Sequence, residues 1–270
     1  MIFTFILLLL LPLLLLEGSE AGEGVRRGLE LAYRAVLPSL FPTMTVCGMI
    51  GELAEYIPLP PAWTLWITSH LCGFPLGTRM LARAYHRGLL SKEQTLRLSA
   101  CCANASPAFL IVYVGEKILG SSREGLILFF CQITVSLFLA LGTGALKITA
   151  PPPPEDRPLL TAITSGFSGA AMGGLTLTGY IAFFSMAAAL LKNIPFFSYL
   201  YGFLELTGGI RGGLFLAAAM TGFSGCSVLL QNAAFLTEEN LSVLPMILGK
   251  CVYTAAMPPL AFLLNNLTNS

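Results

Sequence analysis

Long apolar stretches, separated by short polar segments, make up most of the chain. They run at about 2–16, 38–57, 62–84, 95–115, 124–146, 160–193, 198–231 and 243–264. A helix needs about 20 residues to cross the hydrocarbon core of a bilayer, and several of these stretches reach that length. The pattern predicts an all-α polytopic membrane protein with about six to eight membrane segments.

Two of the stretches contain residues that interrupt a helix. The segment "CGFPLGTRML" (72–81) carries two glycines and a proline, and "TGFSGCSVLL" (221–230) carries two glycines beside Ser224. In hydrocarbon, the backbone groups that a break releases need a partner from the protein or from a water-filled cavity. Both breaks are therefore predicted to line a path for a small polar solute, and a packing kink is the alternative.

Other stretches are predicted to enter the membrane without crossing it. Prolines bound residues 38–57 and two glycines lie near their centre, which favours a re-entrant hairpin, and we interpret residues 175–193 in the same way. Residues 23–37 place apolar side chains at helical spacing, as in a helix that lies in the membrane interface. Residues 1–22 lack the positive start and the clean cleavage site of a signal peptide, so we interpret them as a membrane helix.

A run of four prolines divides the chain. It lies in residues 148–160, which form the expected linker between a first repeat at 23–147 and a second repeat at 161–270. A Gly-Phe pair at each break aligns residues 67–81 with residues 217–230. In both halves a polar turn and a proline-containing helix follow. The sequence therefore predicts a weak internal duplication.

The charges of the two polar turns bear on this alignment. The first turn carries Arg87 and Lys92, whereas its partner carries Glu238 and Glu239 and no basic residue. Because basic residues favour the cytoplasmic side, the two turns are predicted to lie on opposite faces of the membrane, as in inverted repeats. The same order of crossings places Lys192 on the cytoplasmic side. The alternative treats both hairpins as full spans and gives about eight crossings.

Composition excludes several classes of function. Hydrophobic residues make up 55% of the chain and charged residues 11%, and the net charge of +1 lacks the basic excess that nucleic acid requires. The two histidines, His70 and His86, do not stand at ligand spacing from a cysteine pair, so we expect no metal site, disulfide framework or cofactor. No catalytic motif is present, and we expect no enzymatic activity.

Polar residues near the breaks are the candidate binding groups. The segment "CCANASPAFLI" (101–111) places an amide and a hydroxyl in mid-membrane, where an unsatisfied polar group is costly. We expect these groups to contact the solute, and a hydrogen bond between helices is the alternative. Glu205 and Lys250 are the ionisable residues closest to the predicted interior. An ion pair between them, a contact of Lys250 to an anion, and side chains that reach the interface are the three alternatives. The candidate substrate-binding residues are Gly73, Phe74, Pro75, Gly77, Thr78, Asn104, Ser106, Pro107, Glu205, Thr207, Gly222, Phe223, Ser224, Gly225, Gln231 and Lys250.

Five ordered segments resemble the motifs of a known family. They are "LPSLFPTMTVCGMI" (37–50), "CGFPLGTRML" (72–81), "CCANASPAFLI" (101–111), "FLELTGG" (203–209) and "TGFSGCSVLLQ" (221–231). In order and approximate spacing they resemble the YlbJ-type sporulation integral membrane proteins, also called stage V sporulation protein V, which carry the nucleoside-recognition (Gate) domain. The likeness covers about residues 25 to 260.

The resemblance implies a bacterial cell or forespore membrane protein that helps to move dipicolinic acid into the developing spore. It also implies a distant likeness to concentrative nucleoside transporters, whose core has two hairpins and two broken helices in inverted repeats. We therefore expect a transporter or permease for a small polar or anionic metabolite, which binds at the midplane where the two broken helices meet. A transporter of nucleosides or other metabolites and a non-transporting sporulation scaffold are the alternatives. The expected partners are the substrate and the lipid bilayer, with a homo-oligomer or sporulation membrane partners left open.

Overall fold

The fold is known from a computed structural model, which describes residues 12, 18–53, 57, 59–147, 158–192, 197–206, 210 and 212–269. These residues form helices and short connections, and no strand occurs among them. The elements are α2 (Gly18–Leu31), the π-helix η1 (Ala32–Val36), α3 (Leu37–Glu52), α4 (Pro61–Cys72), α5 (Leu76–His86), α6 (Lys92–Cys102), the π-helix η3 (Ala108–Leu119), α7 (Ser122–Gly142), α8 (Leu159–Leu191), α9 (Phe197–Leu204), α11 (Leu214–Phe223), α12 (Gly225–Glu238) and α13 (Leu244–Asn269).

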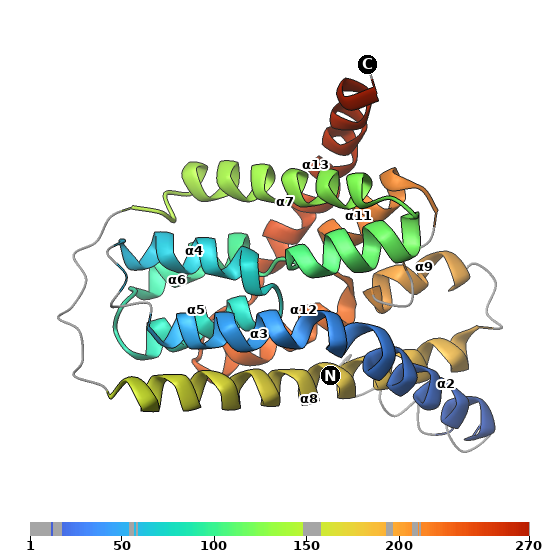
Figure 1. Ribbon diagram of the computed structural model, residues 1–270, viewed down its shortest axis with the longest axis horizontal. Coiled ribbons are helices and arrows are strands. Elements are labelled where there is room, and N and C mark those ends of the chain that lie inside the picture. The colour runs from blue at the N-terminus through green and yellow to red at the C-terminus, as the bar shows by residue number, and fades with distance from the viewer. Residues whose placement is uncertain are drawn as a thin grey trace.

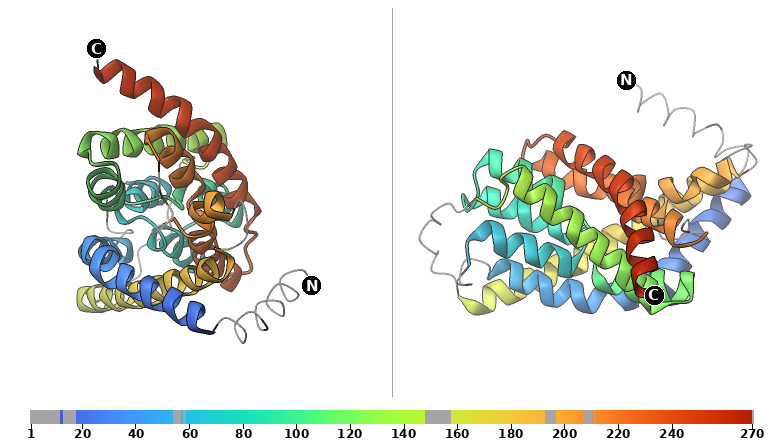
Figure 2. Two further views of the ribbon diagram at one scale, coloured as in Figure 1. Left: turned by 90° about the vertical axis from the view of Figure 1, so that its right-hand side faces the viewer. Right: turned by 90° about the horizontal axis from the view of Figure 1, so that it is seen from above.

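The chain is an all-α polytopic membrane protein. In the described part, five helical segments are long and apolar enough to cross a bilayer: Gly18–Glu52, Ser122–Gly142, Leu159–Leu191, Leu214–Glu238 and Leu244–Thr268. Figure 1 shows most of the helices side by side along the longest axis of the molecule, and Figure 2 shows α13 crossing α7 obliquely. The number of crossings in the whole chain stays a prediction, as does the membrane helix expected at residues 1–22, nearly all of which lie outside the described residues.

One continuous helical segment replaces two elements that the sequence predicted separately. Residues 23–37 were expected on the membrane surface and residues 38–57 in a hairpin, but Gly18–Glu52 is helical throughout, with a π-helical turn at η1. Pro38 lies where η1 passes into α3, and its missing N–H removes one backbone hydrogen bond from the otherwise continuous helix. The prediction of a hairpin failed because Pro42, Gly48 and Gly51 are all accommodated inside the helix.

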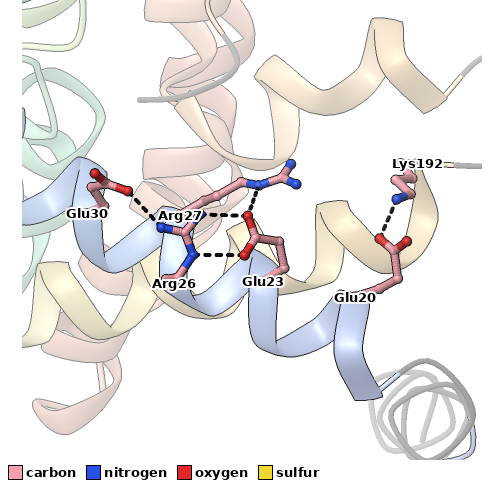
Figure 3. A network of polar contacts seen from close by, with 6 residues as sticks. All are labelled: Glu20, Glu23, Arg26, Arg27, Glu30 and Lys192. Carbon is pink, nitrogen blue, oxygen red and sulfur yellow. Dashed lines mark hydrogen bonds and ion pairs between the residues drawn. The ribbon is translucent and has the colours of Figure 1, made fainter.

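The α2 helix packs along the last turns of α8. A Cβ atom at Gly24 would lie 2.7 Å from the Met186 Cα atom, and one at Gly28 would lie 2.7 Å from the Ala182 Cα atom. These two glycines therefore let the helix backbones approach closely, as small residues do between membrane helices. The surface of α2 carries the exposed ion pairs drawn in Figure 3, and among them Glu20 pairs with Lys192 at the end of α8.

The long helix α8 also corrects a prediction. Residues 175–193 were expected to dip into the membrane and return, but residues up to Leu191 belong to a single helix of 33 residues. Its glycines face α3 at close range, where a Cβ atom at Gly166 would lie 2.6 Å from the Met49 Cα atom. In α8, glycine therefore marks helix packing and not a re-entrant turn.

The first hairpin lies instead at residues 61–86, which were expected to cross as one segment. The α4 helix has 12 residues and α5 has 11, and each is too short to cross a bilayer alone. At the tip between them the Phe74–Pro75 peptide bond is cis and Gly73 has φ 71°. Beyond the tip α5 folds back along α4, because a Cβ atom at Gly77 would lie 2.9 Å from the Ser69 Cβ atom.

After this hairpin the chain crosses the molecule as a broken helix and returns as an unbroken one. The α6 helix ends at Cys102, residues 103–106 are not helical, and η3 continues from Ala108. The α7 helix then runs back, and the amide of Gln94 at the start of α6 donates to the carbonyl of Lys147 just after α7. Tight packing at the turn between η3 and α7 is possible because Gly115 and Gly125 face each other.

The second half also has an interrupted helix followed by an unbroken one, and both run in the opposite direction to those of the first half. The α9 helix is eight residues long and ends at the nonhelical Glu205, and α11 then leads through Ser224 into α12. Residues 198–231 were expected to form one crossing, but only α11 and α12 form an interrupted span. The α13 helix returns, and its end meets the start of α7, where Arg123 donates to Thr268.

Contacts at the helix ends define two faces. The His86 face holds His86 beside Glu239, and also Arg83 beside Glu52 and Ser165. The Lys192 face, at the opposite ends of α3 and α8, holds the Lys192–Glu20 pair. Thus α3, α7 and α12 end at the His86 face, whereas α8, η3 and α13 end at the Lys192 face, as in inverted repeats.

Two predictions from charge are therefore wrong. The polar turns at 87–94 and 234–240 were expected on opposite faces, but the contact between His86 Nδ1 and Glu239 Oε2, at 3.2 Å, places them on the same face. Lys192 was expected on the face of Arg87 and lies on the other. The cause is the alignment of the two Gly-Phe breaks, since residues 72–81 form a hairpin tip and residues 221–230 form a break inside a crossing helix.

Candidate functional site

The tip of the α4–α5 hairpin rests on the break of the α6–η3 helix. A Cβ atom at Gly73 would lie 2.4 Å from the Ser106 backbone nitrogen, and one at Gly77 would lie 2.7 Å from the Cys102 carbonyl oxygen. The Phe74 ring meets the Phe109 ring edge to face, with 5.7 Å between their centroids. These glycines therefore let two interrupted backbones touch in the protein interior.

Side chains of α7 pair much of the backbone that this break releases. Gln132 accepts from the Ala105 N–H at 3.0 Å and donates to the Ala105 carbonyl at 2.9 Å. Ser136 donates to the Cys101 carbonyl at 3.0 Å. The Ser106 hydroxyl accepts from the Phe109 N–H at the start of η3, beside Pro107. The groups that remain for a solute at this break are therefore mainly side chains, not backbone.

Asn104 lies at the centre of the break and is fully buried. Its amide nitrogen is 2.5 Å from the Cys101 carbonyl, 3.1 Å from His70 Nε2 and 3.0 Å from the Tyr253 hydroxyl, and its amide oxygen accepts from Lys250 Nζ at 3.3 Å. One amide thus joins α4, α6 and α13. Buried polar groups that are paired in this way fix the relative positions of the elements that carry them.

The contacts of His70 define which of its nitrogens carries a proton. Nδ1 is 2.8 Å from the Trp66 carbonyl oxygen, which can only accept, so Nδ1 donates. Nε2 then accepts from the amide nitrogen of Asn104. His70 is therefore a neutral imidazole in this arrangement, with the proton on Nδ1.

Lys250 of α13 is a buried lysine whose described partners are neutral groups. It is 2% exposed, donates to the Asn104 amide oxygen, and its Nζ lies 4.9 Å from the centre of the Tyr253 ring. It forms no ion pair with a carboxylate in the described part of the chain, so the Glu205–Lys250 pair, one of the three alternatives, is absent there. Glu205 is itself fully buried and has other interactions.

The second break packs against the chain just after α9. Ser224 and Gly225 both adopt left-handed backbone, with φ 73° and 74°, and a Cβ atom at Gly225 would lie 3.0 Å from the Leu206 nitrogen. The Phe223 and Phe203 rings meet edge to face at 5.5 Å. As at the first break, a glycine in close contact with another backbone and an edge-to-face pair of phenylalanine rings mark the contact. Thr207, predicted to bind substrate, lies outside the described residues.

Three buried polar side chains of α5 and α12 have atoms without a hydrogen-bond partner among the described residues. They are the Thr78 hydroxyl, both polar atoms of the Gln231 amide, and the Asn232 amide oxygen. These residues are at most 1% exposed. The two helices pack together and run in the same direction, since His86 at the end of α5 contacts Glu239 just after α12. Thr78 and Gln231 each lie eight residues before these contacting residues, so they are at similar depth in the membrane.

Tyr253 connects the two breaks. Its backbone carbonyl oxygen would lie 2.8 Å from a Cβ atom at Gly222, just before the second break, and its hydroxyl contacts Asn104 at the first. Among the predicted residues, the structure brings Gly73, Gly77, Asn104, Ser106 and Lys250 into one connected region, with Phe74, Pro75 and Pro107 in the adjoining backbone. It keeps Phe223, Ser224 and Gly225 with Glu205 and Leu206 at the second break.

Sequence reasoning missed three residues of this region. His70, Gln132 and Tyr253 all bond to the first break or to Asn104. Tyr253 stands three residues after Lys250, which places both on one helix face, and this spacing could have indicated that Tyr253 lies near Lys250. Gln132, in the middle of an apolar helix, was another, because a buried amide needs partners. His70 was considered only as a metal ligand, and among the described residues no group of three His, Cys, Asp or Glu side chains could hold a metal ion.

Comparisons with protein-family models, with curated proteins and with solved structures found no match to this chain.

Proposed function

We propose that the protein transports a small anionic metabolite across the membrane and that Lys250 binds the negative charge of this substrate. The observation that carries the proposal is the buried Lys250 ammonium, whose described partners are a neutral amide and an aromatic ring. An ionised group without a counter-charge costs several kcal/mol in a protein interior. An anion that binds beside Lys250 would remove this cost, which makes the site selective for negative charge.

The surrounding groups suit a planar carboxylate. Tyr253 and Asn104 place polar groups next to Lys250, and the unpaired atoms of Thr78, Gln231 and Asn232 offer hydrogen bonds elsewhere in the interior. Dipicolinate, a planar dianion, is the substrate that we favour, in a forespore or bacterial cell membrane. The opposite directions of the two interrupted helices, α6–η3 and α11–α12, support alternating access, since each half could open toward a different face.

Transport into proteoliposomes tests the proposal. Labelled dipicolinate and labelled uridine are offered to the wild-type protein, to Lys250→Met, which keeps the apolar stem, and to Lys117→Met, which removes an exposed lysine. We expect the wild type and Lys117→Met to take up dipicolinate. Lys250→Met should lose uptake about 10- to 100-fold at equal protein level, because a hydrogen bond to a charged group contributes about 1.5–3 kcal/mol.

Other outcomes would overturn the proposal in different ways. Uptake of uridine alone would favour a nucleoside transporter. If neither solute moves under any ion gradient, and if Asn104→Ala and Gln231→Ala leave the protein functional in its host, a membrane scaffold explains the chain better. Undiminished dipicolinate uptake by Lys250→Met would remove Lys250 from the binding site.

A further inference from the structure

A continuous apolar groove runs between α7 and α13 on the outside of the helix bundle. It consists of two adjoining cavities of about 620 and 310 Å³, which share Leu139, Thr143 and Val252. Apolar side chains such as Phe138 and Leu263 form most of its walls. Both α7 and α13 are among the segments that can cross the bilayer, so the groove opens toward lipid.

The floor of the groove is set by a close helix crossing. A Cβ atom at Gly249 would lie 2.4 Å from the Ala100 carbonyl oxygen, so α13 touches the backbone of α6 at this point. Glycine at this position leaves no side chain to fill the space above the contact. A depression therefore forms where α6, α7 and α13 meet, close to the His86 face.

Two basic side chains lie at the same end of the groove. Arg97 lines the groove, donates to the Thr143 carbonyl at 2.8 Å and pairs with Glu93 at 2.5 Å. Lys147 is exposed and has no ion pair among the described residues. A Cβ atom at Gly144 would lie 3.1 Å from Arg97 Nη1 and 3.2 Å from Lys147 Cε, so the two side chains lie side by side. With Glu93 counted, this end keeps an excess of positive charge.

We propose that this groove is a binding site for an anionic diacyl phospholipid. One acyl chain lies in the apolar groove between α7 and α13, and the phosphate lies at Lys147 and Arg97. The apolar walls alone would accept an acyl chain of any lipid, but Lys147, which has no ion pair among the described residues, favours a headgroup with net negative charge. The site is separate from the buried region around Asn104 and does not depend on what the protein transports.

Native mass spectrometry of the purified full-length protein tests the site. The protein is mixed with equal amounts of phosphatidylglycerol and phosphatidylcholine with identical acyl chains, and the lipids that remain bound are counted. We expect the wild type to retain phosphatidylglycerol preferentially. Lys147→Gln should reduce this preference about fivefold, and Lys147→Gln with Arg97→Gln should abolish it while leaving lipid retention. Lys117→Gln, which removes an exposed lysine at the end of η3, is the matched control and should keep the preference.

A second variant tests the groove itself. Val252→Trp fills the part that the two cavities share, so it should reduce retention of both lipids. Equal retention of both lipids by the wild type would overturn the proposal. A preference that survives in the double variant would also overturn it, since the headgroup would then bind elsewhere. A wild-type dimer that Val252→Trp dissociates, without any lipid preference, would assign the groove to a second copy of the chain.

Discussion

Gly73 and Gly88 both have a positive φ angle, which alanine rarely adopts, but their surroundings differ. Their φ angles are 71° and 72°, and a Cβ atom would meet Ser106 at Gly73 but nothing within 4 Å at Gly88. Gly88→Ala should therefore cost about 1–2 kcal/mol of unfolding free energy from backbone strain alone. Gly73→Ala should cost about 1–3 kcal/mol more, because the tip must move away from the break.

Unfolding of the two variants in the same detergent measures this difference. The difference reports the contact between tip and break together with the backbone of Gly73, whose ψ of −174° is open essentially only to glycine. Equal losses of stability would mean that the hairpin tip does not press on Ser106. A larger loss at Gly88 would contradict the tip position altogether.

His70 gives a spectroscopic prediction. In the variant His86→Gln the protein has a single histidine, and ¹⁵N NMR should show a neutral ring with a protonated Nδ1 and an unprotonated Nε2 at neutral pH. The physical reason is that the Trp66 carbonyl requires a donor and the Asn104 amide nitrogen requires an acceptor. The reciprocal variant His70→Gln reports the exposed His86 as a reference. A protonated Nε2 on His70 would show that the contacts of Asn104 are arranged differently.

At the residue scale, the sequence identified two polar groups that lie buried, while their expected role in substrate binding stays a prediction. Asn104 and Lys250 were singled out because a polar group in hydrocarbon needs a partner, and both are buried and bonded to each other. Their pairing could not be predicted, since 145 residues separate them along the chain and both Glu205 and Asn104 could satisfy the lysine. The choice between the two depends on which helix lies beside α13.

At the scale of elements, the contact between α2 and α8 can be tested by two glycines of one helix. A Cβ atom at Gly28 would meet the Ala182 backbone at 2.7 Å, whereas a Cβ atom at Gly22 would meet nothing within 4 Å. Gly28→Leu should lower the free energy of unfolding by about 1–3 kcal/mol through overpacking. Gly22→Leu should be neutral or stabilise by up to about 1 kcal/mol, because leucine forms helix better than glycine.

Thermal unfolding in detergent distinguishes these variants. The two substitutions have the same chemistry and the same helix, so they differ only in the neighbouring backbone of α8. Similar melting temperatures for both would indicate that α2 lies away from α8, on the membrane surface, as its amphipathic sequence alone suggested.

The two Gly-Phe breaks illustrate what composition cannot tell about an element. Both release helix hydrogen bonds, yet the chain turns back at Gly73 and Pro75 and continues in α12 after Ser224. Two short limbs that pack against each other favour the return at the first break. At the second, α11 packs mainly on α13 and α12 on α5 and α8, so the two parts of the helix do not fold together.

For the whole molecule, cysteine labelling can test which segments lie at the His86 face and which lie at the Lys192 face. In a variant without the native cysteines, Lys92→Cys and Ser242→Cys should react with a membrane-impermeant maleimide from the same side, because both lie at the His86 face. Lys117→Cys, at the end of η3, should react from the other side. Labelling of residues 92 and 242 from opposite sides would restore the arrangement that the charges of the two turns suggested and would contradict the fold.

The sequence by itself determined that this is a helical membrane protein and where its helices are interrupted. Apolar length specifies membrane helices, and glycine and proline mark Gly73–Pro75, residues 103–107 and Ser224 as places where a helix is interrupted, because these are local properties of the chain. Only the tertiary structure decided which breaks are hairpin tips, which helices cross, and that Asn104, His70, Tyr253 and Lys250 meet. These outcomes depend on packing between segments that are far apart in the sequence. The hydrophobic pattern constrains each helix separately and does not specify which helices become neighbours.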